Sequence, residues 1–274
     1  MSLLVAAKVK GEGLTTALQA LSLVWPHRGA GRVLAELNPQ GGDLALRYGL
    51  LEPPNLVTLA SAPDSEMTAD QLPRFFQRVG EVSLLLAPPS ADQAQAALSR
   101  RWTSLPRELA AMADTDVLVD AGTLASPAQG NVEVLGCADV GVIVVRPTLD
   151  AVVHLLRRLP ALPRPRGGLV VLVVGEGPIT PGQIADDTGL GVVGDLPWDR
   201  EAAAMLMSGT WSQRALRHSR LLRWSLNVAE TLCSLLDQVP LVPLGGTQPS
   251  DALTAVVDDQ PTAAAYPGRR AAMR

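Results

Sequence analysis

Residues 3–16 read Leu-Leu-Val-Ala-Ala-Lys-Val-Lys-Gly-Glu-Gly-Leu-Thr-Thr, an apolar run that leads into two glycines and two threonines. The pattern predicts a buried strand over residues 3–8, a glycine-rich turn, and a helix that begins near Thr15. Backbone N–H groups in such a turn, together with the N-terminus of the next helix, bind phosphate well. The stretch therefore predicts a phosphate-binding turn at the end of a first strand.

Short apolar runs recur along the rest of the chain, at residues 33–37, 82–86, 117–120, 140–145, 169–174 and 192–196. Helical patterns occur between or after them, at residues 15–24, 104–113, 148–159 and 219–236. Runs that are apolar on both faces are typical of parallel strands covered by helices. We therefore expect an α/β fold, with a doubly wound and mostly parallel sheet flanked by helices, over residues 1–239. Residues 240–274 are rich in Pro, Gly and Ala, and we expect a disordered tail there.

The composition limits the function classes. The 274 residues are 47% hydrophobic but only 3% aromatic, and the net charge of −4 gives no general attraction to nucleic acid or anionic lipid. The sequence contains no signal-peptide pattern and no integral membrane segment, so we expect a cytoplasmic protein. Cys137 and Cys233 lie far apart and are expected to be buried thiols rather than a disulfide or metal site.

The glycine turn departs from a full phosphate loop. That loop reads G-x-x-x-x-G-K-[ST], in which the lysine reaches the β- and γ-phosphates and the hydroxyl holds Mg²⁺. In this chain Lys8 occupies the position of the motif's first glycine, and Leu14 occupies the position of its lysine. Taken alone, the stretch is equally consistent with a strand-to-helix turn that binds no ligand.

Several motifs in order resemble those of the MinD/ParA family of deviant P-loop ATPases, over residues 2–237. The start of the first helix, residues 15–18, is similar to T-T-x-x-L, and residues 36–43 (Glu-Leu-Asn-Pro-Gln-Gly-Gly-Asp) are similar to D-x-D-P-Q-G-G. Residues 116–120 resemble a Walker B strand, residues 138–148 the A-D-x-x-x-x-V-x-x-P-T segment, and residues 196–199 the late L-P-x-D turn.

The resemblance implies a P-loop NTPase-like domain that binds ATP or ADP with Mg²⁺. The residues expected to contact the nucleotide are Lys10, Gly11, Glu12, Gly13, Leu14, Thr15, Thr16, Asn38, Asp120 and Pro197. Thr15 would bind the metal directly, and Asp120 through its outer sphere. A chain that binds no cofactor remains the alternative.

The departures from the family pattern bear on hydrolysis. The family's two loop lysines fall on Val9 and Leu14, and the acid that helps to position the attacking water falls on Asn38. An asparagine cannot accept a proton from that water, and one well-placed cation contributes about 10³- to 10⁵-fold in phosphoryl transfer. We therefore expect weak or absent hydrolysis and assign no catalytic residue. Rescue by Lys8 or Lys10 remains open. Purine recognition is also in question, because residues 173–176 (Val-Val-Gly-Glu) lack the family's asparagine.

Arginines at a spacing of three follow the last strand, at Arg214, Arg217, Arg220 and Arg223. On a helix they would share one side, as a DNA-backbone patch or as a solvated face; the acidic net charge favours the solvated face. The apolar stripe of residues 219–236 is expected to pack on the sheet rather than on a membrane.

The combined expectation is a positioning or assembly scaffold that binds protein partners, forms a homodimer, and hydrolyses little or no ATP. Proteins of the TadZ/CpaE type, which place the secretion machinery of Tad-type pili, are the nearer resemblance. An active ParA-like ATPase, which binds DNA non-specifically in chromosome or plasmid partitioning, and a nucleotide-free interaction module are the alternatives.

Overall fold

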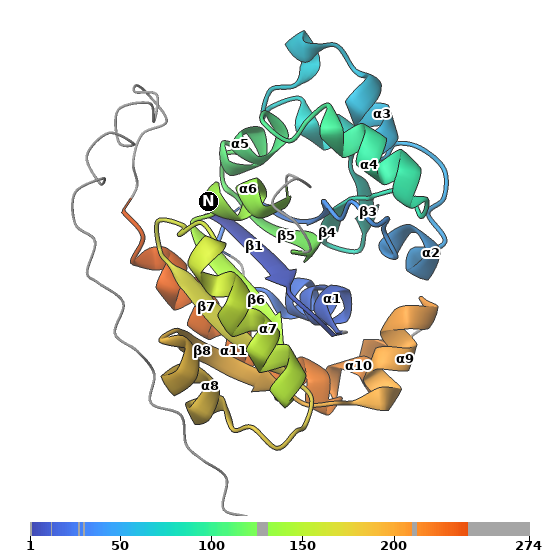
Figure 1. The fold of residues 1–274 in the computed structure, drawn as a ribbon. Coiled ribbons are helices and arrows are strands. Elements are labelled where there is room, and N and C mark those ends of the chain that lie inside the picture. The colour runs from blue at the N-terminus through green and yellow to red at the C-terminus, as the bar shows by residue number, and fades with distance from the viewer. Residues whose placement is uncertain are drawn as a thin grey trace, which may run out of the picture. The chain divides into compact units, whose positions relative to one another are not determined.

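An eight-stranded sheet runs through the middle of the protein (Figure 1). The computed structural model describes residues 2–11, 13–26, 28–29, 31–124, 131–209 and 213–240, without the side chains of residues 213 and 214. The strands are β1 (Ser2–Lys8), β2 (Gly31–Glu36), β3 (Gln77–Val79), β4 (Val82–Leu85), β5 (Thr115–Thr123), β6 (Val140–Val145), β7 (Leu169–Val174) and β8 (Gly191–Leu196). They lie in the order β3-β4-β2-β5-β1-β6-β7-β8, and every pairing is parallel except that of β3 with β4.

Helices cover both faces of the sheet. They are α1 (Leu14–Val24), α2 (Leu44–Tyr48), α3 (Leu56–Ser61), α4 (Ala91–Ser99), α5 (Leu105–Ala110), α6 (Asn131–Gly136), α7 (Leu149–Arg158), α8 (Pro181–Thr188), α9 (Arg200–Ser208), α10 (Gln213–Arg217) and α11 (Arg220–Asp237). Short 3₁₀ helices occur at Asp64–Glu66, Leu72–Phe75 and Leu159–Ala161. The buried residues of α1, α2 and α9 to α11 share one apolar cluster, and those of α3 and α5 to α8 share the other. The predicted fold class, a doubly wound and mostly parallel sheet flanked by helices, is confirmed.

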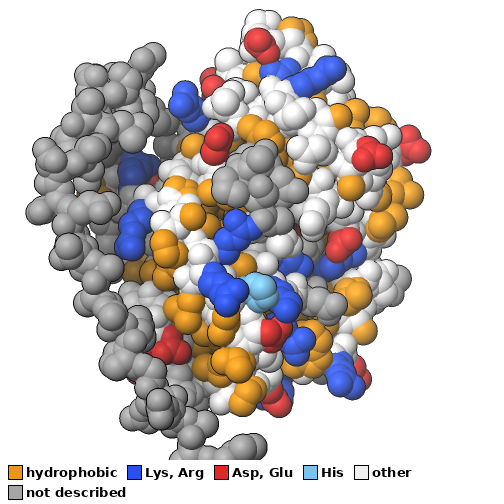
Figure 2. Space-filling model, viewed as in Figure 1, with side chains coloured by type: hydrophobic (Ala, Val, Ile, Leu, Met, Phe, Trp, Pro, Cys, Tyr) orange, Lys and Arg blue, Asp and Glu red, His pale blue; other side chains and the backbone are white. Residues whose placement is uncertain are grey.

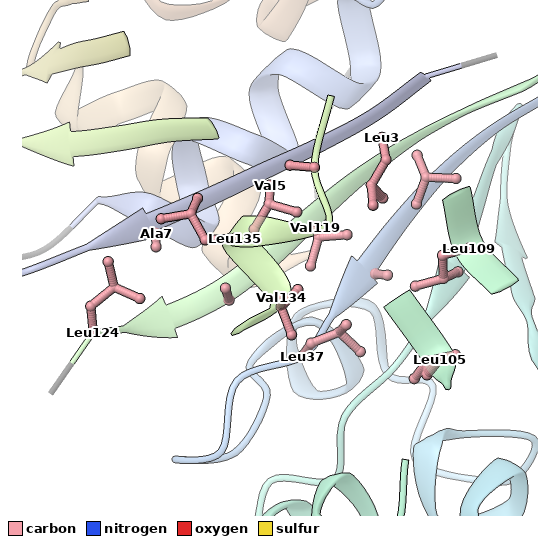
Figure 3. Packing of buried hydrophobic residues seen from close by; sticks show 14 of the residues in the cluster. Leu3, Val5, Ala7, Leu37, Leu105, Leu109, Val119, Leu124, Val134 and Leu135 are labelled. Atoms are coloured by element: carbon pink, nitrogen blue, oxygen red, sulfur yellow. The ribbon is translucent and has the colours of Figure 1, made fainter. Parts of the chain in front are cut away.

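The central strand β1 shows why the sheet forms. Leu3, Val5 and Ala7 point into the cluster beneath α5 and α6, while Leu4 and Ala6 point into the cluster beneath α1. Figure 3 shows the first three among the packed side chains of β5 and α6. Because both faces are covered, the strand has apolar residues at successive positions rather than at alternate ones.

The last helix, α11, closes the face that carries α1. Its buried stripe includes Leu222, Ala229 and Leu236, and the helix packs against α1 and β8. The prediction that this stripe packs on the sheet is confirmed for these residues, although Leu226 is 41% exposed. None of the described helices is long and apolar enough to cross a membrane.

The helix α7 covers part of the other face. It buries Ala151, Val152 and Leu155 and turns its polar side to solvent. Figure 2 shows basic side chains gathered on the face where α7 lies, with acidic side chains among them. The mixture of charges is typical of a solvated helix face.

The two edges of the sheet are irregular. At one edge, β3 is only three residues long and runs antiparallel to β4. At the other edge, β8 carries a register shift opposite Val171 and Leu172, with Gly194 at φ 153°. A bulge of this kind bends the strand and raises its twist.

Residues 1–240 form one compact unit. Of the tail that we expect over residues 240–274, all except Pro240 lies outside the described residues. Cys137 and Cys233 are both free thiols, half-buried and buried respectively.

Candidate functional site

The glycine turn lies at the carboxyl end of β1, between β1 and α1. From β1 the chain moves to one edge of the sheet through β2, and later to the other edge through β6, β7 and β8. Open α/β sheets bind ligands outside the carboxyl ends of their strands, where the direction of winding reverses. The position of the predicted phosphate-binding turn therefore agrees with the architecture.

Two glycines give the turn its shape. Gly11 has φ 97° and Gly13 has φ 103°, a region that residues with a side chain rarely adopt. A methyl group on Gly13 would also lie 3.0 Å from Cγ1 of Val174, so the turn is packed closely against the end of β7. Glu12, which we expected to contact a nucleotide, lies outside the described residues.

Thr15 and Asp120 are joined directly. The Thr15 hydroxyl donates to Oδ2 of Asp120 at 2.6 Å, and the backbone N–H of Gly122 donates to Oδ1 at 2.9 Å. Burial raises the pKa of Asp120, while these two hydrogen bonds and the positive charge of Lys8 oppose the rise. A hydroxyl backed by a buried carboxylate is the arrangement that holds Mg²⁺ in phosphate-loop proteins.

Leu14 occupies the position of the missing lysine. It is the first residue of α1, only 2% exposed, and belongs to the apolar cluster that contains Leu18 and Leu196. Its side chain therefore serves packing and supplies no charge.

A cleft of about 420 Å³ opens beside the turn. Its lining around the turn includes Lys8, Gly13, Thr15, Thr16, Asp43 and Arg47. Its apolar lining includes Val174, Leu196, Pro197, Trp198 and Met207. Trp198 is 41% exposed and Met207 58% exposed. Such a mixed lining suits a ligand that carries both an anionic group and a flat apolar group.

Lys8 and Lys10 differ in their surroundings. Lys8 lines the cleft, and its charge acts on the pKa of Asp120. Lys10 forms an ion pair at 2.9 Å with Asp150, at the start of α7. This contact and a hydrogen bond from Thr148 lower the pKa of Asp150 to about 2. Lys8 is therefore the better placed of the two for a ligand in the cleft.

Glu36 and Asn38 hold the segment after β2. The Glu36 carboxylate is 1% exposed and accepts hydrogen bonds from the backbone N–H groups of Asp43, Leu44 and Ala87. Burial raises the pKa of Glu36 to about 8. Asn38 does not line the cleft: its Oδ1 accepts from the backbone N–H of Gln40 at 3.0 Å.

Asp199 lines the cleft and is hydrogen-bonded to two helices. Its Oδ1 accepts from the backbone N–H of Ala202 in α9 at 3.0 Å, and its Oδ2 accepts from that of Leu221 in α11 at 3.2 Å. Acceptors at these positions satisfy N–H groups that helix termini leave free. The late turn of residues 196–199 is therefore anchored to both helices.

The arginines 214, 217, 220 and 223 lie on two helices rather than one, since α10 ends at Arg217 and α11 begins at Arg220. Arg217, Arg220 and Arg223 are exposed, and the side chain of Arg214 lies outside the described part.

Three residues of the site were missed by the sequence interpretation. Arg47 lines the cleft and donates to the Thr16 hydroxyl at 3.1 Å. Trp198 forms part of the cleft, and the guanidinium carbon of Arg146 lies 5.0 Å from the centre of its ring. None of these contacts leaves a spacing signal, because the partners lie 31 and 52 positions apart in the chain.

The residues present fit a magnesium nucleotide at the turn. A Cβ at Gly11 would contact Arg146, and one at Gly13 would contact Val174, so the turn has room for backbone alone at these positions. Thr15 with Asp120 offers the oxygen ligands that Mg²⁺ prefers. Bound there, the nucleotide would supply a phosphate chain and the metal a compensating charge. The chain itself contributes backbone N–H groups, the Thr15 hydroxyl and the nearby cations Lys8 and Arg47.

Solved structures share this fold at low sequence identity. A ParA family ATPase from Chlorobium tepidum is 19% identical, with a TM-score of 0.67, over 84% of this chain and 98% of that one. The septum site-determining protein MinD from Pyrococcus horikoshii, complexed with Mg-ADP, is 14% identical, with a TM-score of 0.65, over 88% and 100%. A chain of the MinC:MinD cell division protein complex from Aquifex aeolicus is 14% identical, with a TM-score of 0.62, over 90% and 99%.

Comparison by sequence adds no relative. No family model matches the chain, and no curated protein matches it significantly. The protein therefore has the fold of the ParA and MinD ATPases, the fold that the order of its motifs predicted.

Proposed function

We propose that this protein is a positioning or assembly scaffold whose cleft binds a magnesium nucleotide with little or no hydrolysis. The observation that carries the proposal is the pairing of Thr15 with buried Asp120 beside a turn in which Leu14 replaces the lysine. The elements that hold Mg²⁺ and phosphate are retained, whereas the cation that stabilises a transferring phosphate is replaced by a core leucine. Binding can therefore persist where turnover is lost.

The partner of such a scaffold is another protein. The MinC:MinD complex joins a chain of similar fold to a different protein, and the resemblance to TadZ/CpaE proteins points to the secretion machinery of Tad-type pili. A homodimer that closes over the cleft is the second association we propose. Size-exclusion chromatography with light scattering, with and without Mg²⁺-ATP, measures it.

Thermal unfolding with and without millimolar Mg²⁺-ADP or Mg²⁺-ATP tests the proposal. A ligand present at about 100 times its dissociation constant adds about 2.7 kcal/mol of stability, which raises Tm by several degrees in a domain of this size. The matched control is Gly13→Ala, which should fold but lose most of the shift. An unchanged Tm for the wild-type protein would leave a nucleotide-free interaction module, and rapid ATP turnover would refute the scaffold.

An active partitioning ATPase is the second candidate, favoured by the exposure of Arg217, Arg220 and Arg223. It predicts ATP turnover that DNA stimulates, and DNA binding that weakens with salt. Replacing the three arginines by glutamine should abolish that binding if this candidate is right. Unchanged or absent DNA binding would leave them as a solvated face.

A further inference from the structure

Arg146 leaves the sheet beside the glycine turn. In the pairing of β6 with β1, Val144 lies opposite Lys8, and residues two apart in a strand point to the same side. Arg146 comes two residues after Val144, directly beyond the end of β6. The alternation therefore directs Arg146 towards the side of the sheet on which Lys8 enters the cleft.

Two contacts fix the course of the Arg146 side chain. A methyl group on Gly11 would lie 3.3 Å from its Cδ and 3.4 Å from its Cγ, so the aliphatic stem runs along the backbone of the turn. The guanidinium carbon then lies 5.0 Å from the centre of the Trp198 ring, a cation–π contact. Arg146 thus contacts both the glycine turn and Trp198, a residue that lines the cleft.

Arg146 has no charged partner among the described residues. Within the part of the chain that the structure describes, no carboxylate forms an ion pair with Arg146, and its Nε is buried without a hydrogen-bond partner. Lys10, which precedes Gly11 in the chain, is by contrast paired with Asp150 at 2.9 Å. Buried donors in folded proteins normally have partners, so an unpaired guanidinium beside a phosphate-binding turn calls for an anion.

We propose that Arg146 binds the phosphate chain of the ligand and replaces the cations missing at Val9 and Leu14. The inference rests on the proposed function, because it concerns the same cleft. A guanidinium can donate two parallel N–H bonds to two phosphate oxygens, and its stacking on Trp198 leaves the edge that carries these donors free. The ligand class is therefore a polyphosphate, carried by a nucleotide or free in solution.

Isothermal titration of the full chain tests this assignment, with ADP, ATP and inorganic tripolyphosphate as ligands in the presence of Mg²⁺. Arg146→Gln should weaken binding of all three by about tenfold or more, since charge-assisted hydrogen bonds contribute about 1.5–3 kcal/mol. Arg157→Gln is the matched control, because it removes the same charge from the exposed far end of α7 and should change affinity less than about twofold. Arg146→Lys keeps the charge but loses the planar fork and should fall between the two.

The outcomes separate this inference from the proposed function. Wild-type protein that binds none of the three ligands refutes both. Tight wild-type binding that Arg146→Gln leaves unchanged refutes only the role of Arg146. A loss of affinity confined to the two nucleotides also refutes it, because that result would mean that Arg146 contacts the base or the ribose. A loss that includes tripolyphosphate supports it, and the ratio of wild-type affinities for ATP and tripolyphosphate tells the two sources of phosphate apart.

Discussion

Substitution of Asp199 by alanine tests how far one carboxylate holds the wall of the cleft together. The side chain accepts from the N-terminal N–H groups of α9 and α11, at 3.0 and 3.2 Å. Loss of a capping acceptor costs about 1 kcal/mol, and the negative charge near two helix N-termini adds a few tenths more. We therefore expect Asp199→Ala to lower the free energy of unfolding by about 2 kcal/mol, which is about 4–8 °C in Tm.

The assay is urea unfolding monitored by circular dichroism. The slope of the unfolding free energy against urea concentration should be the same for the variant and the wild-type protein. Asp195→Ala is the matched control, because Asp195 is an exposed carboxylate four residues earlier and its loss should cost less than about 0.5 kcal/mol. Asp199→Asn keeps one acceptor and should lose about half as much as alanine. Ser219 already caps α11 through the Leu222 N–H, so Asp199 serves the neighbouring Leu221 N–H. If Asp199→Ala and Asp195→Ala were equally stable, water would be satisfying the Leu221 N–H in the variant, and the reasoning would be refuted.

Three further outcomes are expected. Leu14→Lys should tighten Mg²⁺-ATP binding about tenfold or more in calorimetry while it lowers the free energy of unfolding. The control Leu14→Met should change neither quantity much. Weaker binding by the lysine variant would contradict the placement of phosphate beside residue 14. Glu36, whose pKa is raised to about 8 in the folded state, binds a proton that the unfolded chain releases above about pH 4.5, so stability should fall from about pH 5 to about pH 8. Glu36→Gln should flatten that slope in urea unfolding; an equally steep slope would exclude Glu36 as its cause. Gly122 has φ 69°, and a Cβ there would clash with Oδ1 of Asn38, so Gly122→Ala should lower the free energy of unfolding by about 2 kcal/mol. An unchanged free energy of unfolding would show that the loop can adjust to the methyl group without cost.

The sheet could be predicted because its strands are continuously apolar. Residues 140–145 and 169–174 were predicted with the bounds that β6 and β7 have in the structure. β3 was missed, because three residues that include Gln77 and Arg78 carry no apolar run. The last helix was predicted to start at Ser219, which is the N-cap of α11, but the short helix α10 before it was not predicted.

Less of the site could be predicted. The sequence showed that Leu14 stands where a lysine is expected, but not that its side chain joins the core. The ion pair of Lys10 with Asp150 and the stacking of Arg146 on Trp198 depend on crossovers between strands. Such contacts have no sequence period, so only the folded chain reveals which cations remain available to a ligand.

The irregular edges of the sheet have a consequence for how copies of the protein can meet. An exposed, regular edge strand is a template on which another chain can add a strand. Here one edge ends in the three-residue β3, and the other ends in the bulged β8, which carries exposed Asp195 beside Gly194. Both edges thus disfavour continuation of the sheet from one molecule into the next. We therefore expect this protein to associate with itself through helices and loops, and not by extending the sheet from one molecule to the next, even at high local concentration.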